Sequence, residues 1–349
     1  MIDHACAFIL AGGSGERFWP LSRSGTPKHL LRLLDTRTLL ETTVERLRGA
    51  LPLERIFVLT NIAQAKAAHE AVPGLPPENI ISEPVKRDTA PACALATAMA
   101  SRLGPDTVCT VLPADAMIHD VEMFRSQLAL MSRAASQEDA ILTFGIPPAH
   151  ASTAFGYLEF GEPIDAGLIT VNRFVEKPDA ETAATYLASG HHAWNAGIFA
   201  WRVEWFLTEA ARLAPELASF VKGFPREGDP SAYLAEHFEK LPKISVDYAI
   251  LEKTRRVLAV QAGFDWDDVG SWTALPDHLP VDAQGNCVKG EAATVDSRGN
   301  VVVTSGRLVA LCGVENLVVV ETPDAILVCH RDAAQNIKKL QPLLPEALR

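Results

Sequence analysis

Short apolar runs alternate with longer segments of helical periodicity over the first 145 residues. The apolar runs are strand-like and cover residues 5–10, 55–60, 79–82, 107–112 and 140–145. Between them, apolar positions recur at helical spacing over residues 38–50, 62–71, 90–103 and 121–136. This alternation predicts an α/β fold with a Rossmann-like, mixed but mostly parallel sheet flanked by helices. Ligands of such sheets bind outside the carboxyl ends of the strands.

The pattern changes twice further along the chain. Strands are expected over 156–160, 169–175 and 197–201, and helices over 204–213, 231–239 and 245–252. After residue 282, brief apolar runs separated by Gly, Asp, Asn and Pro cover 287–288, 293–295, 300–304, 308–312, 317–321 and 325–329. Their even spacing predicts a small β domain, either a solenoid fragment such as a left-handed β-helix or a compact sandwich, closed by a short helix over 332–340. We therefore predict two domains, a catalytic one at 1–282 and a small β domain at 283–349.

Composition excludes several classes of protein. With 48% hydrophobic and 21% charged residues, the chain is globular rather than disordered. A net charge of −11 argues against a nucleic-acid partner. No apolar run approaches the roughly 20 residues of a membrane helix, and Met1-Ile-Asp-His lacks the cationic start of a secretory signal. The six cysteines include no Cys-x-x-Cys, so we expect buried free thiols in a soluble, cytoplasmic protein with no membrane partner.

The most informative segment is a glycine-rich turn that follows the first predicted strand. Gly12, Gly13 and Gly15 allow backbone N–H groups to approach a polyanion closely, and Arg17 and Lys28 follow as cations. The spacing matches neither the dinucleotide-binding fingerprint nor the Walker pattern. A glycine turn can be purely structural, but the two cations and the Trp-Pro-Leu at 19–21 favour a phosphate-binding role.

Two groups of acids are candidate metal ligands. Asp115 follows the strand-like run 107–112, where a carboxylate suits Mg²⁺ but could equally cap a helix or a turn. Asp265-Trp-Asp-Asp-Val-Gly-Ser-Trp holds three acids within four positions, which repel one another unless a cation or hydrogen-bond donors offset them. A solvated acidic loop is the alternative, although it leaves Trp266 and Trp272 unexplained.

The glycine turn together with Pro27-Lys28 resembles the signature of the sugar-1-phosphate nucleotidylyltransferases. The similarity recurs in blocks from about residue 5 to 330 and is strongest to the mannose-1-phosphate guanylyltransferases, or GDP-mannose pyrophosphorylases. The resemblance implies transfer of GMP from GTP to mannose 1-phosphate, with release of pyrophosphate and with Mg²⁺ as cofactor. It implies the fold of the nucleotide-diphospho-sugar transferases.

The resemblance also assigns residues. It implies catalytic roles for Arg17, Lys28, Asp115, Lys177 and Asp268, with Asp115 and Asp268 as metal ligands and Asp267 in reserve. The residues expected to bind nucleotide are Leu10, Ala11, Gly12, Gly13, Gly15, Glu83, Arg87, Thr89, Ala90, Pro113 and Asp115. Those expected to bind the sugar phosphate are Gly156, Glu176, Lys177 and Asn195. The block that starts at Glu83 carries the preference for guanine, whose N1–H and 2-amino groups suit a carboxylate or carbonyl acceptor.

A weaker match places Asp247 and Tyr248 near the acceptor site, and Phe18, His29, Ala116 and Ala196 depart from the residues common in the family. The alternatives are another hexose-1-phosphate nucleotidylyltransferase, using glucose 1-phosphate or a different nucleoside triphosphate, and a noncatalytic homologue that senses nucleotide sugars. The spacing of the glycines in the glycine-rich turn disfavours a dinucleotide-dependent oxidoreductase. The end of the chain at Arg349 disfavours a bifunctional isomerase-guanylyltransferase. Exposed edges of the small β domain suggest a homodimer.

Overall fold

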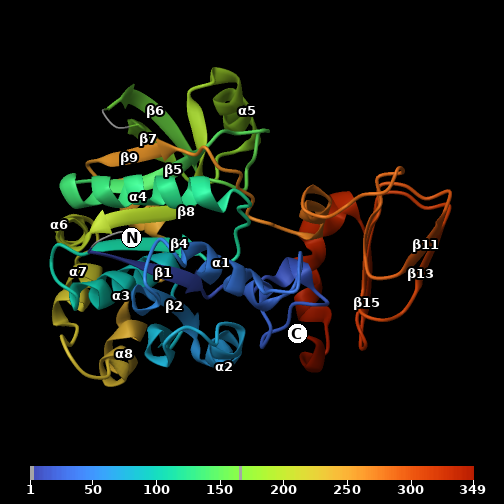
Figure 1. Cartoon of the computed structure of the whole chain (residues 1–349), viewed down its shortest axis with the longest axis horizontal. Coiled ribbons are helices and arrows are strands. Elements are labelled where there is room, and N and C mark those ends of the chain that lie inside the picture. The colour runs from blue at the N-terminus through green and yellow to red at the C-terminus, as the bar shows by residue number, and fades with distance from the viewer. Residues whose placement is uncertain (1–3, 165–166) are drawn as a thin grey trace.

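A computed structural model describes residues 4–164 and 167–349, so the interpretation of Met1–Asp3 lies outside the described residues. A nine-stranded mixed sheet in the order β3-β2-β1-β4-β8-β5-β9-β7-β6 forms the centre of the large domain (Figure 1). Its strands are β1 (Ala5–Ala11), β2 (Ile56–Asn61), β3 (Ile80–Glu83), β4 (Val108–Pro113), β5 (Ile141–Ile146), β6 (Tyr157–Pro163), β7 (Leu168–Val175), β8 (His192–Arg202) and β9 (Val257–Gln261).

The α-helices are α1 (Leu39–Leu47), α2 (Ile62–Ala71), α3 (Thr89–Ser101), α4 (Val121–Gln137), α5 (Ala180–Ser189), α6 (Val203–Leu213), α7 (Pro215–Gly223) and α8 (Ser231–His237). Shorter 3₁₀ turns occur at Glu16–Phe18, Lys28–Leu30, Leu53–Arg55, Pro77–Asn79, Phe238–Lys240, Trp272–Asp277 and Glu346–Leu348. The five strands and four helices predicted in the first half of the chain are confirmed. None of the described helices is long and apolar enough to cross a membrane.

Strand β1 shows why the sheet is covered on both faces. It pairs in parallel with β2 and with β4, so that Ile9 lies opposite Val58 and Leu112. Side chains alternate across a strand: Ala7 and Ile9 enter one core with α1, α2 and α4, whereas Phe8 enters the other with α3, α6 and α7. The continuous apolar run at the start of the chain is therefore that of a strand buried on both faces.

The second half of the sheet corrects the sequence-based expectation. Strand β8 runs antiparallel to both β4 and β5 and is much longer than the predicted 197–201. The first part of β8 contains polar residues, including Asn195, so the hydrophobic pattern did not predict it as strand. Helices α5 and α7 and strand β9 were not predicted, and the helix expected over 245–252 is a π-helical turn at Asp247–Leu251.

The C-terminal domain is a parallel β-helix rather than a sandwich, and the left hand expected for it stays a prediction. Its strands are β10 (Cys287–Lys289), β11 (Ala292–Val295), β12 (Val301–Thr304), β13 (Val309–Cys312), β14 (Leu317–Glu321) and β15 (Ile326–His330). Cys287 pairs in parallel with Val301, which pairs in turn with Val318, so successive coils stack in register. Only β15 returns antiparallel, and a 3₁₀ helix, Arg331–Leu343, follows it.

The β-helix packs directly on the glycine-rich turn of the large domain. The Phe18 ring lies 5.0 Å from that of Trp272, and both enter one buried cluster with Val301, Val318 and Ile337. The Trp19 indole N–H donates to the carbonyl of Leu348 at 2.9 Å. Figure 1 shows the red C-terminal helix between the blue N-terminal loops and the orange β strands. The predicted boundary at residue 282 stays a prediction, but the two parts share a core.

Candidate functional site

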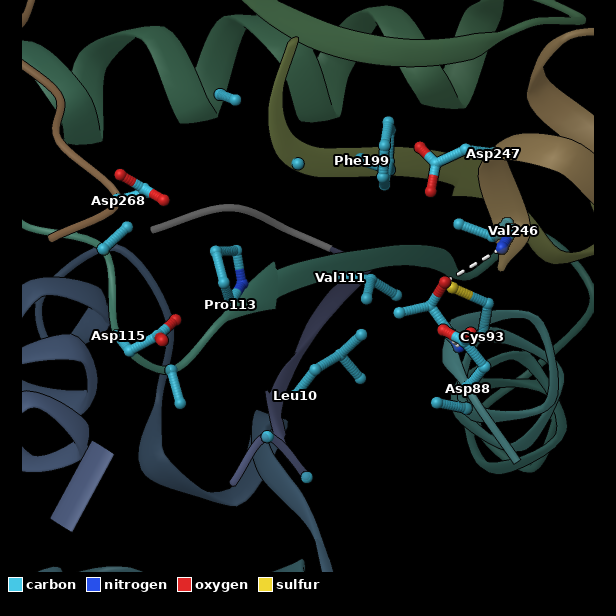
Figure 2. Close-up of a pocket in the computed structure, with 18 of the residues that line it drawn as sticks. Leu10, Asp88, Cys93, Val111, Pro113, Asp115, Phe199, Val246, Asp247 and Asp268 are labelled. Carbon is cyan, nitrogen blue, oxygen red and sulfur yellow. Dashed lines mark hydrogen bonds between the residues drawn. The ribbon is translucent and has the colours of Figure 1, made fainter. Parts of the chain in front are cut away.

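A cleft of about 430 Å³ opens at the carboxyl ends of β1 and β4, where the fold class predicts a ligand. The predicted residues that line it are Leu10, Gly12, Gly13, Gly15, Lys28, Glu83, Thr89, Pro113, Asp115, Gly156, Glu176, Asn195 and Asp268. In Figure 2, Asp115 and Asp268 lie at one end and Asp88, Cys93 and Asp247 at the other, with Leu10, Val111 and Pro113 between them. The structure therefore gathers segments from across the large domain around one cavity.

Gly15 lets the glycine-rich turn lie against the Lys28 segment. Its φ is +63°, and a Cβ on this residue would lie 2.3 Å from the Lys28 Cβ and 2.7 Å from the Lys28 backbone nitrogen. A side chain is thus excluded both by backbone conformation and by space. Gly12 and Gly13 border the cleft without comparable crowding.

Lys28 connects the loops that carry the two candidate acids. Its Nζ lies 2.7 Å from Asp115 Oδ2 and also donates a hydrogen bond to the backbone carbonyl of Asp268. The side chain is only 9% exposed, so this ammonium is held in place before any ligand binds. A buried cation of this kind is suited to phosphate.

Asp268 carries a carboxyl group that is short of compensating charge. Burial raises its pKa to about 6, and the nearby charges of Asp267 and Asp115 add to the effect, whereas Lys28 and Arg17 oppose it. A divalent cation would relieve this deficit. No group of three or more His, Cys, Asp or Glu side chains positioned for a metal occurs in the part of the chain that the structure describes. Two carboxylates fit Mg²⁺, which takes its other ligands from phosphates and water.

Asp267, the alternative candidate for a metal ligand, is hydrogen-bonded to other groups of the protein. It accepts hydrogen bonds from the backbone N–H of Val269 at 2.6 Å and pairs with His278 Nε2 at 2.9 Å. Burial raises the pKa of Asp267, but these hydrogen bonds outweigh it and leave the pKa below its usual value. Because Asp267 does not line the cleft, the geometry favours Asp268 of the two.

A second cavity of about 360 Å³ adjoins the cleft and shares Gly15, Lys28, Asp115 and Asp268 with it. Arg17 lies in this second cavity, and its Nε is buried with no hydrogen-bond partner in the described structure. The remaining lining residues are Ser14, Glu16, Phe18, Gly270 and Lys338. The two predicted cations therefore line this second cavity together with both candidate acids.

The end of the cleft beside α3 holds Glu83 and Thr89. Burial raises the pKa of Glu83 to about 7. Asp88 caps α3 by accepting from the Thr89 backbone N–H at 2.8 Å. The Thr89 hydroxyl accepts from the Val246 N–H at 2.9 Å, the dashed line in Figure 2.

The opposite wall of the cleft combines Gly156, Glu176 and Asn195. The Asn195 backbone N–H donates to the Gly156 carbonyl at 2.8 Å, and a Cβ on Gly156 would lie 2.5 Å from Glu176 Oε2. The Asn195 amide oxygen accepts from the Gly197 backbone N–H at 3.2 Å, so its NH₂ group is the part left for a ligand. Asp247 also lines this region, and burial followed by the charge of Glu176 raises its pKa to about 7.

Besides Arg17, four predicted site residues do not line the cleft. Lys177 is 59% exposed, and its Nζ pairs with Glu176 Oε1 at 2.6 Å. Burial lowers the Lys177 pKa, but the hydrogen bond and charge of Glu176 leave it raised. Arg87 lies 3.7 Å from Glu239. Ala11 and Ala90 are buried in the two cores.

Sequence reasoning missed part of the lining. Phe155 and Trp266 line the cleft with their rings 5.3 Å apart, and only Trp266 had a signal, beside the acid cluster. His29 is buried, and burial lowers its pKa to about 4, so a neutral imidazole with an unpartnered Nε2 borders the cleft. Lys338 gave no local signal, because only the packing of the C-terminal domain brings it to the second cavity.

The chain belongs to the nucleotidyl transferase family, whose model matches residues 6–284. A second model, described as a MannoseP isomerase/GMP-like beta-helix domain, matches residues 278–342. These matches agree with the cleft and the β-helix described above. The chain is an enzyme of this family, and the predicted resemblance is confirmed.

Named relatives are similar over almost the whole chain. A mannose-1-phosphate guanylyltransferase of Escherichia coli is 39% identical over 350 residues, which cover 98% of this chain and 74% of the relative. The xanthan biosynthesis protein XanB of Xanthomonas campestris is 38% identical over 346 residues, covering 98% of this chain and 73% of that protein. A crystal structure described as a mannose-1-phosphate geranyltransferase from Thermus thermophilus superposes with a TM-score of 0.89 at 35% identity, covering 97% of this chain and 99% of that one.

Proposed function

We propose that this enzyme transfers GMP from GTP to mannose 1-phosphate, giving GDP-mannose and pyrophosphate. The observation that carries the proposal is the single cleft in which Lys28, Asp115 and Asp268 face the Glu176–Asn195 wall. The E. coli relative, 39% identical, is named for the same activity. A cleft with phosphate-binding groups at one end and hydroxyl-binding groups along one wall suits a nucleotide and a sugar phosphate together.

The reaction needs no protein nucleophile. A nonbridging oxygen of mannose 1-phosphate attacks the α-phosphorus of GTP, a new P–O bond forms, and the bond to the bridging oxygen of pyrophosphate breaks. The protein therefore contributes positioning and charge stabilisation. Backbone N–H groups of the glycine-rich turn, Arg17 and Lys28 would hold the terminal phosphates. Lys177 would have to leave Glu176 to orient the acceptor phosphate.

We propose Mg²⁺ as cofactor, held by Asp115 and Asp268. When bound, the ion would supply positive charge to the reacting phosphates. Asp115 would then exchange its contact with Lys28, now 2.7 Å long, for the ion, which would free the ammonium for phosphate. The mostly buried Asp268 carboxyl would gain the compensating charge that it lacks.

Substrate choice would rest on the two ends of the cleft. Glu83 is buried beside the start of α3 and would accept hydrogen bonds from guanine N1–H and the 2-amino group. Glu176 and the amide NH₂ of Asn195 would bind mannose hydroxyls, while Gly156 leaves the space that a side chain would take from Glu176.

Pyrophosphate release tests the proposal. Release should require GTP, mannose 1-phosphate and Mg²⁺ together, and GDP-mannose should be the product. A panel of the four nucleoside triphosphates with mannose 1-phosphate or glucose 1-phosphate separates this activity from that of a related nucleotidylyltransferase. Binding of GDP-mannose without turnover of any pair would instead favour a sensing homologue.

We also propose that the enzyme is a cytoplasmic homodimer. Free thiols suit a reducing compartment, and four of the six cysteines are buried and free as predicted, whereas Cys329 is half-buried and Cys312 is exposed. Ile326 and Val328 on edge strand β15 are each about 60% exposed, and an apolar strand edge favours pairing with a second copy. Light scattering at micromolar concentration should give twice the monomer mass of 37.7 kDa, and a monomer mass would reject the dimer.

A further inference from the structure

A lysine of the C-terminal domain borders the cavity that contains the two cations of the glycine-rich turn. Lys338 lines the 360 Å³ cavity together with Arg17, Lys28, Asp115 and Asp268. Four of these five residues belong to the large domain, and more than 300 positions separate Lys338 from Arg17 and Lys28. The cavity is therefore built by both domains.

The position of Lys338 is fixed by its neighbours. The 3₁₀ helix Arg331–Leu343 contacts the turn Glu16–Phe18. Ala334 and Ile337 are buried in the cluster that contains Phe18 and Trp272. Lys338 directly follows the buried Ile337, which fixes its backbone. The Lys338 side chain is exposed and lines the cavity.

The charges of the cavity leave this ammonium available. Lys28 is already paired with Asp115, and Glu16 and Asp268 add two more carboxylates. Within residues 4–164 and 167–349, Lys338 makes no ion pair. The terminal phosphates of a nucleoside triphosphate carry several negative charges, and Arg17 with a partly neutralised Lys28 would not balance them. A third cation would complete the site.

We propose that Lys338 binds the terminal phosphates of the nucleoside triphosphate and the departing pyrophosphate, so that the C-terminal β-helix is part of the active site. This inference rests on the proposed nucleotidylyl transfer. A cation at this position stabilises the charge that accumulates on the leaving group as its bond to the α-phosphorus breaks. In the reverse reaction the same contact binds pyrophosphate.

The test compares Lys338→Ala with Lys339→Ala. Lys339 is an exposed lysine next in sequence that does not line either cavity, so it controls for net charge and for mutation of this helix. Both variants are measured at saturating Mg²⁺, forward with GTP and mannose 1-phosphate and in reverse with GDP-mannose and pyrophosphate. Thermal unfolding checks that each variant is folded.

We expect Lys338→Ala to lower kcat/KM for GTP and for pyrophosphate by about tenfold or more, the scale of one charge-assisted hydrogen bond. The KM for mannose 1-phosphate should stay within about twofold, and Lys338→Arg should recover most of the loss. Lys339→Ala should match the wild type.

Three results would overturn the inference while the wild type remains active: equal kinetics of the two alanine variants, an equal loss for every substrate, or no recovery with arginine. The last two would indicate a structural role. A wild type that turns over no nucleotide and sugar phosphate refutes the proposed function instead, so the two failures are distinguishable.

Discussion

Gly15→Ala tests whether the close approach of the glycine-rich turn to Lys28 positions the phosphate-binding groups. The new methyl would lie 2.3 Å from the Lys28 Cβ and 2.7 Å from its backbone nitrogen, where ordinary carbon contacts are about 3.5–4.0 Å. Backbone cannot yield as a flexible side chain can. The turn and the Lys28 segment would have to separate by about 1 Å.

Two effects lower the folding stability of Gly15→Ala. An alanine at φ +63° costs about 1–2 kcal/mol of folding free energy, and overpacking adds about 1–3 kcal/mol. We therefore expect the free energy of unfolding to fall by about 2–5 kcal/mol. A displacement of about 1 Å at Lys28 should lower kcat by about 100-fold.

Gly25→Ala is the matched control. Gly25 lies in the same loop, three positions before Lys28, and a Cβ there would meet no atom within 4 Å. Pyrophosphate release would be measured for both variants, together with urea unfolding. Wild-type stability and an activity within about threefold for Gly15→Ala would refute the reasoning, because the contact would then impose no constraint.

Three further predictions concern the acids and the shared core. Asp268→Ala should lower kcat by several powers of ten while circular dichroism stays unchanged, and near-normal turnover would reject Asp268 as a metal ligand. Since burial raises the pKa of Glu83 to about 7, the carboxylate forms as pH rises through 7. The KM for GTP should therefore fall from pH 6 to pH 8, and a Glu83→Gln variant with the same pH profile would contradict this. Ile337→Ala should lower the free energy of unfolding by about 2–5 kcal/mol in urea titrations, since this side chain is only 2% exposed; a loss below about 1 kcal/mol would mean that the interface relaxes.

Local patterns predicted the elements that depend on local rules. A strand buried on both faces must be continuously apolar, so β1, β2 and β4 were visible in the sequence. Strand β8 was only half visible, because Asn195 and its neighbours serve the cleft as well as the sheet. The antiparallel placement of β8 between β4 and β5 depends on sheet order, for which a hydrophobic pattern carries no information.

The sequence alone determined the alternation of strands and helices, the glycine-rich turn and the residue types proposed to bind phosphate and metal, because backbone conformation and side-chain chemistry are local properties. Tertiary structure alone decided that Asp115 and Asp268 share a cavity with Lys28 and that Asp267 pairs with His278 instead. It also brought Lys338 beside Arg17. These are contacts between distant segments, fixed by sheet order and by the buried cluster that joins the β-helix to the large domain.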